Sequence, residues 1–381
     1  MIAQQLHFFT LGLLQMFFIF AAVITYRLPK ITKSRYIFFW VLVYWAFTAA
    51  KDLFYNIYSF EIVSSLLVFD LFSVPVTSLY LWEQVFPHSM TRKRAFLILF
   101  PFIFLVGLYF LSLLFIPLPQ DFSVLTLWTM PLFVPSLFLG LYIILIFLYG
   151  VFTFFIVVRQ TYRYDSAVKQ NYSYTDNINL KWLRSLMYFL LLILVVFFAL
   201  YVLLVSIPAI YKDLMYYCFL LAVWIYIFRR VLKQQVPAEL LNYIYEERKL
   251  INVAPSSEIS DKKEMPYYDA LQSKIERAFE EQKLYLNPRL SIGELASACY
   301  TNRTYLSDFL NKRQQESFYD YVNRYRVENV SIPLLKNIEK NHSMADVAEL
   351  SGFGSYSTFR RAFVKYTGKS PQSYQSNIDD G

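Results

Sequence analysis

Two short stretches in the last third of the chain carry arginine and other hydrogen-bonding side chains at helical spacing. They contribute Arg303, Thr304, Ser307, Asp308 and Asn311 from the first stretch, and Ser355, Tyr356, Ser357, Arg360 and Arg361 from the second. Arginine can pair with two acceptor atoms of guanine, and hydroxyl, amide and carboxylate groups have base partners of their own. Basic side chains and helix starts also hold phosphates. We therefore predict these ten residues as contacts to double-stranded DNA.

The first stretch is predicted to be the second helix of a helix–turn–helix. Ser291 and Glu294 have the spacing of a capping box that starts the first helix. Tyr300 and Thr301 follow as the turn, and Asn302 caps the second helix. The apolar positions, which repeat with the helical period, are Ile292, Leu295, Ala296, Cys299, Leu306, Phe309 and Leu310. Their burial would leave the polar face open.

A second copy of the same pattern begins at Ser343, with Asp346 three residues on. A turn at 352–354 follows, and Ser355 caps a helix whose buried positions are predicted to be Phe359, Phe363 and Tyr366. One such copy is typical of an ordinary helical hairpin. Two copies joined by a long helix over 318–330 are more specific, because a helix–turn–helix places its second helix in the major groove.

The two copies resemble the DNA-binding domain of the AraC/XylS family of bacterial transcription regulators over residues 267–374. The matching positions are Glu294, Leu295, Ala296, Tyr305, Leu306, Ser307, Phe318, Tyr321, Val322, Arg324 and Arg326 in the first half, and Val347, Ala348, Gly352, Phe353, Ser355, Ser357, Phe359, Arg361, Phe363, Gly368, Ser370, Pro371 and Tyr374 in the second. The resemblance implies a seven-helix, all-α domain whose recognition helices enter successive major-groove segments near a promoter. RNA polymerase and a second copy of the chain are then candidate partners.

Four positions depart from the family pattern. Tyr300 replaces the usual turn glycine, so we expect a non-glycine residue with positive φ there. Pro333 is expected to shorten the joining helix. Val364 removes a basic phosphate contact, and Asp308 places an acid on the first recognition helix. The last two changes bear on operator sequence and affinity.

The remainder of the chain is too apolar for a water-soluble globule. Hydrophobic residues make up 57% of the 381 residues and charged residues only 17%, against about 25% charged in soluble domains. Seven apolar runs are predicted as membrane spans, because about 20 residues cross the hydrocarbon layer. They cover residues 6–26, 36–54, 62–82, 95–116, 135–158, 185–207 and 214–228. The predicted fold class is all-α: a seven-span bundle and a cytoplasmic domain with two helix–turn–helix motifs.

The basic residues beside these spans predict the orientation of the chain across the membrane. With the N-terminus outside, the inner segments carry fifteen Lys and Arg, whereas the outer loops carry only Lys51 and Lys212. By the positive-inside rule, this bias places the C-terminus in the cytoplasm. We expect a multi-pass protein of the bacterial cytoplasmic membrane, with the lipid bilayer as a further partner.

Three domains are predicted: the membrane region 1–230, a linker 231–266 and the DNA-binding domain 267–381. Within the linker, residues 237–251 have the pattern of a short amphipathic helix. Residues 252–266, which are rich in serine, proline and charge, are predicted to be flexible.

Asp70 is the one carboxylate predicted deep inside a span. An intramembrane charge is a candidate functional group by default. Gln15 lies at a similar depth, so a hydrogen bond between the two is expected if their helices touch. Asp70 can either hold two helices together or take part in sensing.

The outer loops are too short to form a binding domain, so the unknown signal must come through the membrane plane, a partner membrane protein or a pocket among the spans.

The sequence offers no catalytic or metal-binding pattern, and we expect neither an enzyme nor a cofactor. Its two cysteines, Cys218 and Cys299, and three histidines, His7, His88 and His342, lack the spacing of a metal site. Both cysteines are expected to be buried. The alternative to a membrane-embedded transcription regulator is a membrane receptor or transporter whose helical tail binds a protein.

Overall fold

The computed structural model describes residues 2–28, 32–58, 63–86, 89–115, 134–176, 178–203, 209–233, 265–337 and 342–379. This described part is helical throughout and contains no strand, only an isolated β-bridge between Tyr172 and Ser291. The chain divides into two compact units. The N-terminal unit comprises Met1–Tyr162 and Lys181–Gln234, and the C-terminal unit comprises Arg163–Leu180 and Gln235–Gly381. The segment Arg163–Leu180, which lies between two predicted spans, thus groups with the C-terminal unit.

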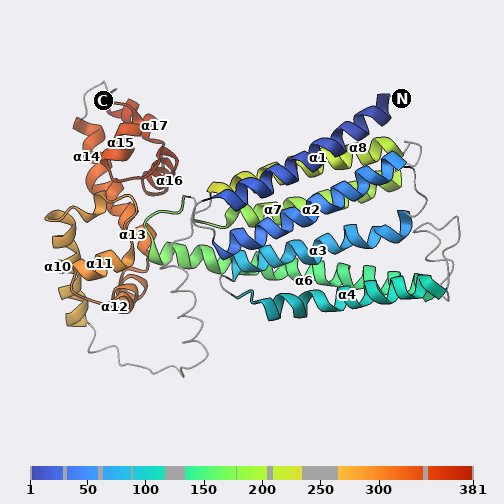
Figure 1. The fold of residues 1–381 in the computed structure, drawn as a ribbon. Helices are drawn as coiled ribbons and strands as arrows, with labels where there is room; N and C mark the ends of the chain where they lie inside the picture. The colour runs from blue at the N-terminus through green and yellow to red at the C-terminus, as the bar shows by residue number, and fades with distance from the viewer. Residues whose placement is uncertain are drawn as a thin grey trace. The chain divides into compact units, whose positions relative to one another are not determined.

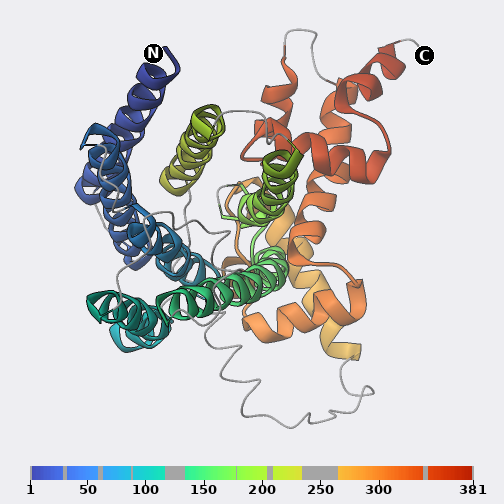
Figure 2. The same ribbon diagram turned by 90° about the vertical axis from the view of Figure 1, so that its right-hand side faces the viewer.

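A helix occupies each of the seven stretches predicted as spans. They are α1 (Ile2–Arg27), α2 (Lys33–Tyr58), α3 (Val63–Val85), α4 (Arg92–Phe115), α6 (Val134–Asn171), α7 (Lys181–Leu203) and α8 (Ala209–Lys233). Among the described residues, five of them, α1, α2, α4, α6 and α8, are long and apolar enough to cross a membrane. Helix α6 is much longer than its predicted span, and in both Figure 1 and Figure 2 it lies alongside α4.

Two apolar clusters join six of the seven long helices of the N-terminal unit. The first joins α1, α2, α3 and α8 through Phe18, Phe38, Tyr80 and Trp224, among others. The second joins α3, α4 and α6, with Phe102 and Tyr142 at its centre. Many large apolar side chains outside these clusters remain exposed. A monomer in water rarely leaves so much apolar surface uncovered, so the composition of this surface suits lipid contact.

The C-terminal unit is a chain of short helices in two halves. They are α10 (Met265–Glu280), η2 (Leu284–Leu286), α11 (Ile292–Ala298), α12 (Arg303–Asp308), η3 (Phe309–Gln314), α13 (Phe318–Tyr325), η4 (Arg326–Ser331), α14 (Ile332–Asn337), α15 (Met344–Leu350), α16 (Tyr356–Thr367) and α17 (Pro371–Asp379). Because η3 continues α12, and η4 and α14 continue α13, the described residues 265–337 and 342–379 form seven continuous helices and the short turn η2. In Figure 1 the two halves lie at opposite ends of the joining helix α13–α14.

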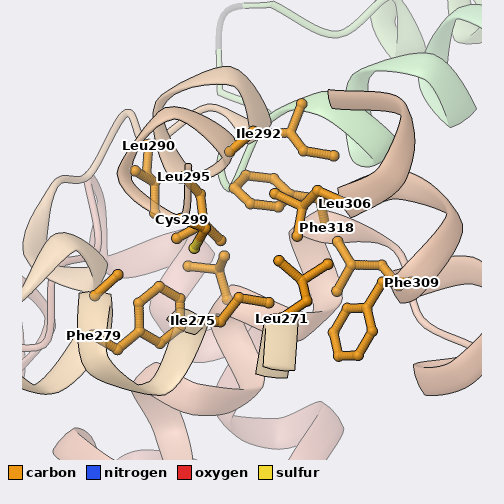
Figure 3. Close-up of a cluster of buried hydrophobic side chains, with 14 of the residues drawn as sticks. Leu271, Ile275, Phe279, Leu290, Ile292, Leu295, Cys299, Leu306, Phe309 and Phe318 are labelled. Atoms are coloured by element: carbon orange, nitrogen blue, oxygen red, sulfur yellow. The ribbon is translucent and has the colours of Figure 1, made fainter. Parts of the chain in front are cut away.

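Each half has its own apolar core. In the first half, side chains from α10, α11, α12 and α13 point toward one another, with Leu271, Ile275 and the thiol of Cys299 among them (Figure 3). In the second half, Val347, Phe359 and Phe363 are fully buried at the centre of the core. Burying an aliphatic or aromatic side chain of this size contributes about 1.5–3 kcal/mol. The two cores therefore hold α12 and α16 in place.

Three sequence-based expectations require correction or qualification. Cys299 is buried as predicted, but Cys218 is exposed, because it faces outward from α8. The joining helix does not end near Pro333: it runs on to Asn337, and the wider π-helical turns of η4 precede the proline, which has no N–H to donate. The predicted amphipathic helix at 237–251 lies outside the described residues.

Candidate DNA-binding surface

The first helix–turn–helix has the caps that its sequence predicts. The Ser291 side chain accepts a hydrogen bond from the backbone N–H of Glu294, and the Glu294 carboxylate accepts one from the backbone N–H of Ser291, at 2.7 Å. Asn302 caps α12 through the backbone N–H of Tyr305. Between the two helices, Tyr300 has φ 52°. The expected positive φ at a non-glycine residue is confirmed, and the ring of Tyr300 is almost fully exposed, where its size costs little.

The second helix–turn–helix repeats this construction. Ser343 and Asp346 form a capping box, and the hydrogen bonds from Ser343 hold the pKa of the Asp346 carboxyl below its ordinary value. The turn depends on Gly352, whose φ is 82°. A Cβ there would lie 2.8 Å from Leu286 Cα and closer still to the carbonyl oxygen of Tyr285, so this turn packs directly against the backbone of the first half. Ser355 then caps α16 through the backbone N–H of Thr358.

Nine of the ten predicted DNA-contacting residues lie on α12, η3 and α16, and the tenth, Ser355, is the cap of α16. Thr304, Asn311, Ser357, Arg360 and Arg361 are exposed, whereas Arg303, Ser307, Asp308, Ser355 and Tyr356 are half-buried. The amide of Asn311 donates to Ser307 Oγ at 3.2 Å, which orients both side chains on one face. The capped starts of both helices provide partial positive charge.

Tyr356 differs from the other nine in its packing. Its ring lies against Phe359 at the edge of the second core, and its hydroxyl accepts a hydrogen bond from the side chain of Gln372. The tyrosine therefore ties α16 to α17. Its half-exposed ring still leaves a polar edge at the helix start.

Arg326 connects the two halves from inside the C-terminal unit. It is 1% exposed and donates to the carbonyl oxygens of Tyr285 and Asn287, each at 2.7 Å, and to Asn323 Oδ1 at 2.9 Å. Its guanidinium also lies 5.4 Å from the ring centre of Phe353 in the second half. Burial lowers the pKa of Arg326 to about 9, which leaves it charged at neutral pH. Sequence reasoning placed Arg326 only in the family pattern and missed this role.

A segment far away in sequence, residues 171–176, also lies against this surface. Ser173 is fully buried, and its backbone N–H donates to the carbonyl oxygen of Leu290 at 3.0 Å. Its own carbonyl oxygen accepts from Asn323 Nδ2 at 3.0 Å. Arg303, the first residue of α12, donates to Asn171 Oδ1. Nothing in the sequence pattern pointed to this contact, because the segment has neither helical period nor charge run.

Asp176 makes the last contacts of this segment, all to α16 and its cap. One carboxylate oxygen accepts from Ser355 Oγ at 2.6 Å and from Thr358 Oγ1 at 2.7 Å. The other accepts from the Arg361 guanidinium at 3.2 Å. Two of the predicted DNA-contacting residues, Ser355 and Arg361, thus share one carboxylate of the chain itself.

The intramembrane candidates lie in the N-terminal unit. Asp70 on α3 accepts a hydrogen bond from Lys51 Nζ on α2 at 2.6 Å, and the same ammonium group lies 2.8 Å from Asp52. The expected bond between Asp70 and Gln15 is not formed. Gln15 Oε1 is buried and has no hydrogen-bond partner among the described residues. A cation is a stronger hydrogen-bond partner for a carboxylate than a neutral amide is, so Lys51 takes the place expected for Gln15.

Among the described residues, no three histidine, cysteine, aspartate or glutamate side chains gather closely enough to hold a metal ion. The exposed polar faces of α12 and α16 remain the principal chemical feature of the C-terminal unit.

A family model described as a helix-turn-helix domain matches residues 295–377, which begin inside α11 and contain the whole of the second capped helix pair. The C-terminal part of the chain is an AraC-type helix-turn-helix domain. A relative in Bacillus subtilis (strain 168), the uncharacterized HTH-type transcriptional regulator YobQ, is 31% identical over 94 residues. That segment is 25% of this chain, and it spans 38% of the length of the relative. No solved structure matches the chain significantly. The AraC-type domain thus rests on sequence similarity together with the helix arrangement described above.

Proposed function

We propose that this protein is a membrane-embedded transcription regulator that binds promoter DNA sequence-specifically through α12 and α16 of its AraC-type domain. The observation that carries the proposal is the pair of capped recognition helices with exposed polar faces, one in each half and joined by a single helix. Arg360 and Arg361 provide the guanidinium groups on the second face, and Thr304 and Asn311 provide shorter donors and acceptors on the first. Arginine paired bidentately with guanine is the commonest specific contact in the major groove.

The membrane half of the proposal has separate support. Five of the described helices have the length and composition of membrane spans, and the places of the other two, α3 and α7, fit the predicted count of seven. The fifteen basic residues on one side of the seven-span arrangement favour an external N-terminus and a cytoplasmic DNA-binding domain. A chain with this topology would keep its sensor and its DNA-binding module in one polypeptide.

We further propose that the pair Asp70–Lys51 takes part in sensing. The two side chains bridge α2 and α3, and Asp52 shares the ammonium group while accepting from the Tyr217 hydroxyl of α8 at 3.3 Å. A ligand or membrane partner that draws one of these charges away would alter the contacts among three helices. The bridge could then report an event in the membrane region.

The proposed function is tested by the salt dependence of DNA binding by the full-length protein in lipid nanodiscs. A protein that neutralises phosphates loses affinity steeply as salt rises. We expect duplex binding that weakens in this way, and a clear loss of affinity for Arg360→Ala. The matched control is Arg277→Ala on α10, an exposed arginine that lies outside both recognition helices. Absence of duplex binding at low salt, or equal losses for the two variants, would contradict the proposal.

A further inference from the structure

Residues 171–176 form an unexpected partner of the recognition helices. The segment contacts the first half through Leu290, the joining helix through Asn323, and the second half through the α16 residues that bind Asp176. It also reaches the first residue of α12, since Asn171 accepts a hydrogen bond from Arg303. A single short segment thus spans the starts of both recognition helices.

Asp176 accepts the kinds of hydrogen bond that a phosphate bound at the N-terminus of a helix accepts. Its carboxylate accepts from two hydroxyl groups and a guanidinium group, and it lies at the capped N-terminal turn of the twelve-residue helix α16. Phosphate oxygens of the DNA backbone accept hydrogen bonds from the same kinds of donor, since serine, threonine and arginine side chains at helix starts commonly bind them. A carboxylate and a phosphate cannot accept from the same hydrogen atoms at the same time.

We propose that the segment 171–176 is an internal competitor of DNA, in which Asp176 occupies the position of a backbone phosphate at α16. The proposal rests on the function proposed above, and it names how that site is regulated. In this resting arrangement, the donors of Ser355, Thr358 and Arg361 are engaged by the chain itself. DNA binds fully only after the carboxylate has left them.

The position of the segment along the chain supplies a route for the signal. Helix α6 runs without interruption to Asn171, and α7 begins at Lys181. The competitor segment is therefore attached directly to two helices of the membrane region, through a connection of nine residues, 172–180. A rotation or shift of α6 would pull on Asn171 and Ser173, and with them on Asp176. Such a connection carries movement of the spans to the DNA-contacting residues.

A purely structural role is the competing reading, in which Asp176 simply fixes the first turn of α16. The partial exposure of the contact between Asp176 and Arg361 favours competition between Asp176 and DNA. The side chains of Asp176 and Arg361 are 37% and 54% exposed, so water and ions reach the pair, whereas Ser173 and Asn323 nearby are fully buried. An exposed ion pair is weak. The contact at Asp176 is thus the part of the segment that a duplex could displace.

The test measures operator affinity of the full-length protein in nanodiscs for the wild type, Asp176→Asn and Glu281→Gln. The operator is the duplex recovered by mapping genomic occupancy. Asparagine keeps the shape of the side chain and can still accept hydrogen bonds, so the fold is retained. Glu281→Gln is the matched control, since it removes one negative charge at the exposed end of α10. We expect Asp176→Asn to bind the operator about 5- to 30-fold more tightly than the wild type, and Glu281→Gln to change affinity less than about twofold.

Hydrogen exchange of the wild-type protein gives a second readout that does not depend on affinity. The Ser173 amide, which donates to Leu290, should exchange faster when the operator is bound, because the segment loosens as Asp176 is displaced. Equal affinities of Asp176→Asn and Glu281→Gln, or unchanged or slower exchange at Ser173 with DNA bound, would overturn the competition. Failure of all three proteins to bind any duplex would instead refute the proposed function, and the competition would fall with it.

Discussion

Gly352→Ala should destabilise the C-terminal unit far more than Gly368→Ala, although both glycines have positive φ. The values are 82° and 73°, so an alanine at either position adopts the left-handed conformation, at about 1–2 kcal/mol. Only at Gly352 does the added Cβ meet other atoms, the backbone of Tyr285 and Leu286. Nothing lies within 4 Å of a Cβ at Gly368.

The overlap at Gly352 adds a second cost, because backbone atoms cannot move aside as the end of a flexible side chain can. Overpacking typically costs about 1–3 kcal/mol. We therefore expect Gly352→Ala to lose about 2–5 kcal/mol of unfolding free energy and Gly368→Ala about 1–2 kcal/mol. Operator binding should weaken with Gly352→Ala, since the turn positions α16.

Native-state hydrogen exchange of the full-length protein in nanodiscs measures this difference at the buried amides of Phe359 and Phe363. Each 1.4 kcal/mol of lost stability corresponds to about tenfold faster exchange when the amides open by unfolding of the unit. Equal acceleration in the two alanine variants would refute the reasoning, because it would mean that the turn at Gly352 does not pack on the first half.

Three further predictions follow from the surface, the intramembrane pair and the topology. Arg360→Ala should weaken operator binding by about 1–3 kcal/mol if the side chain reads a base, and equal losses on random duplexes would make it a phosphate contact only. Arg361→Ala, which removes a donor to the proposed phosphate position, should weaken binding to operator and random duplexes alike. Fluorescence anisotropy measures both. Asp70→Asn should change transcription output in response to the stimulus without changing the operator affinity of the purified protein; an unchanged output at normal protein level would leave Asp70 a structural bridge. Reporters fused after Gln120 and Gln170 should read external and cytoplasmic, respectively, and the reverse pair would exclude the proposed orientation.

The local features of the C-terminal unit could be predicted from the sequence because each depends on neighbours within one helical turn. Ser291 with Glu294, and Ser343 with Asp346, close their capping boxes over three residues, and the positive φ of Tyr300 follows from its place after a short helix. Apolar periodicity likewise identifies Phe359 as a core residue. Such patterns depend on residues only a few positions apart, so they can be recognised without knowledge of the fold.

The contacts on which the proposed regulation rests could not be predicted in this way. Asp176 meets Thr358 across 182 residues, and Ser173 meets Asn323 across 150. A short polar segment has no hydrophobic periodicity from which such a distant partner could be predicted. At Asp70, equal depth in the membrane suggested Gln15, but depth does not say which helices touch, and the ion pair with Lys51 forms instead.

The proposed regulator occupies its promoter as one intact polypeptide while it remains in the membrane. The direct measurement is to crosslink cells under inducing conditions, isolate the promoter from the membrane fraction and determine the size of the bound protein. Full-length protein on the promoter, with activity that falls when residues 256–263 are deleted to shorten the connection, is the predicted result. A released fragment about the size of the C-terminal domain that accounts for all promoter occupancy would contradict binding by the intact, membrane-attached protein.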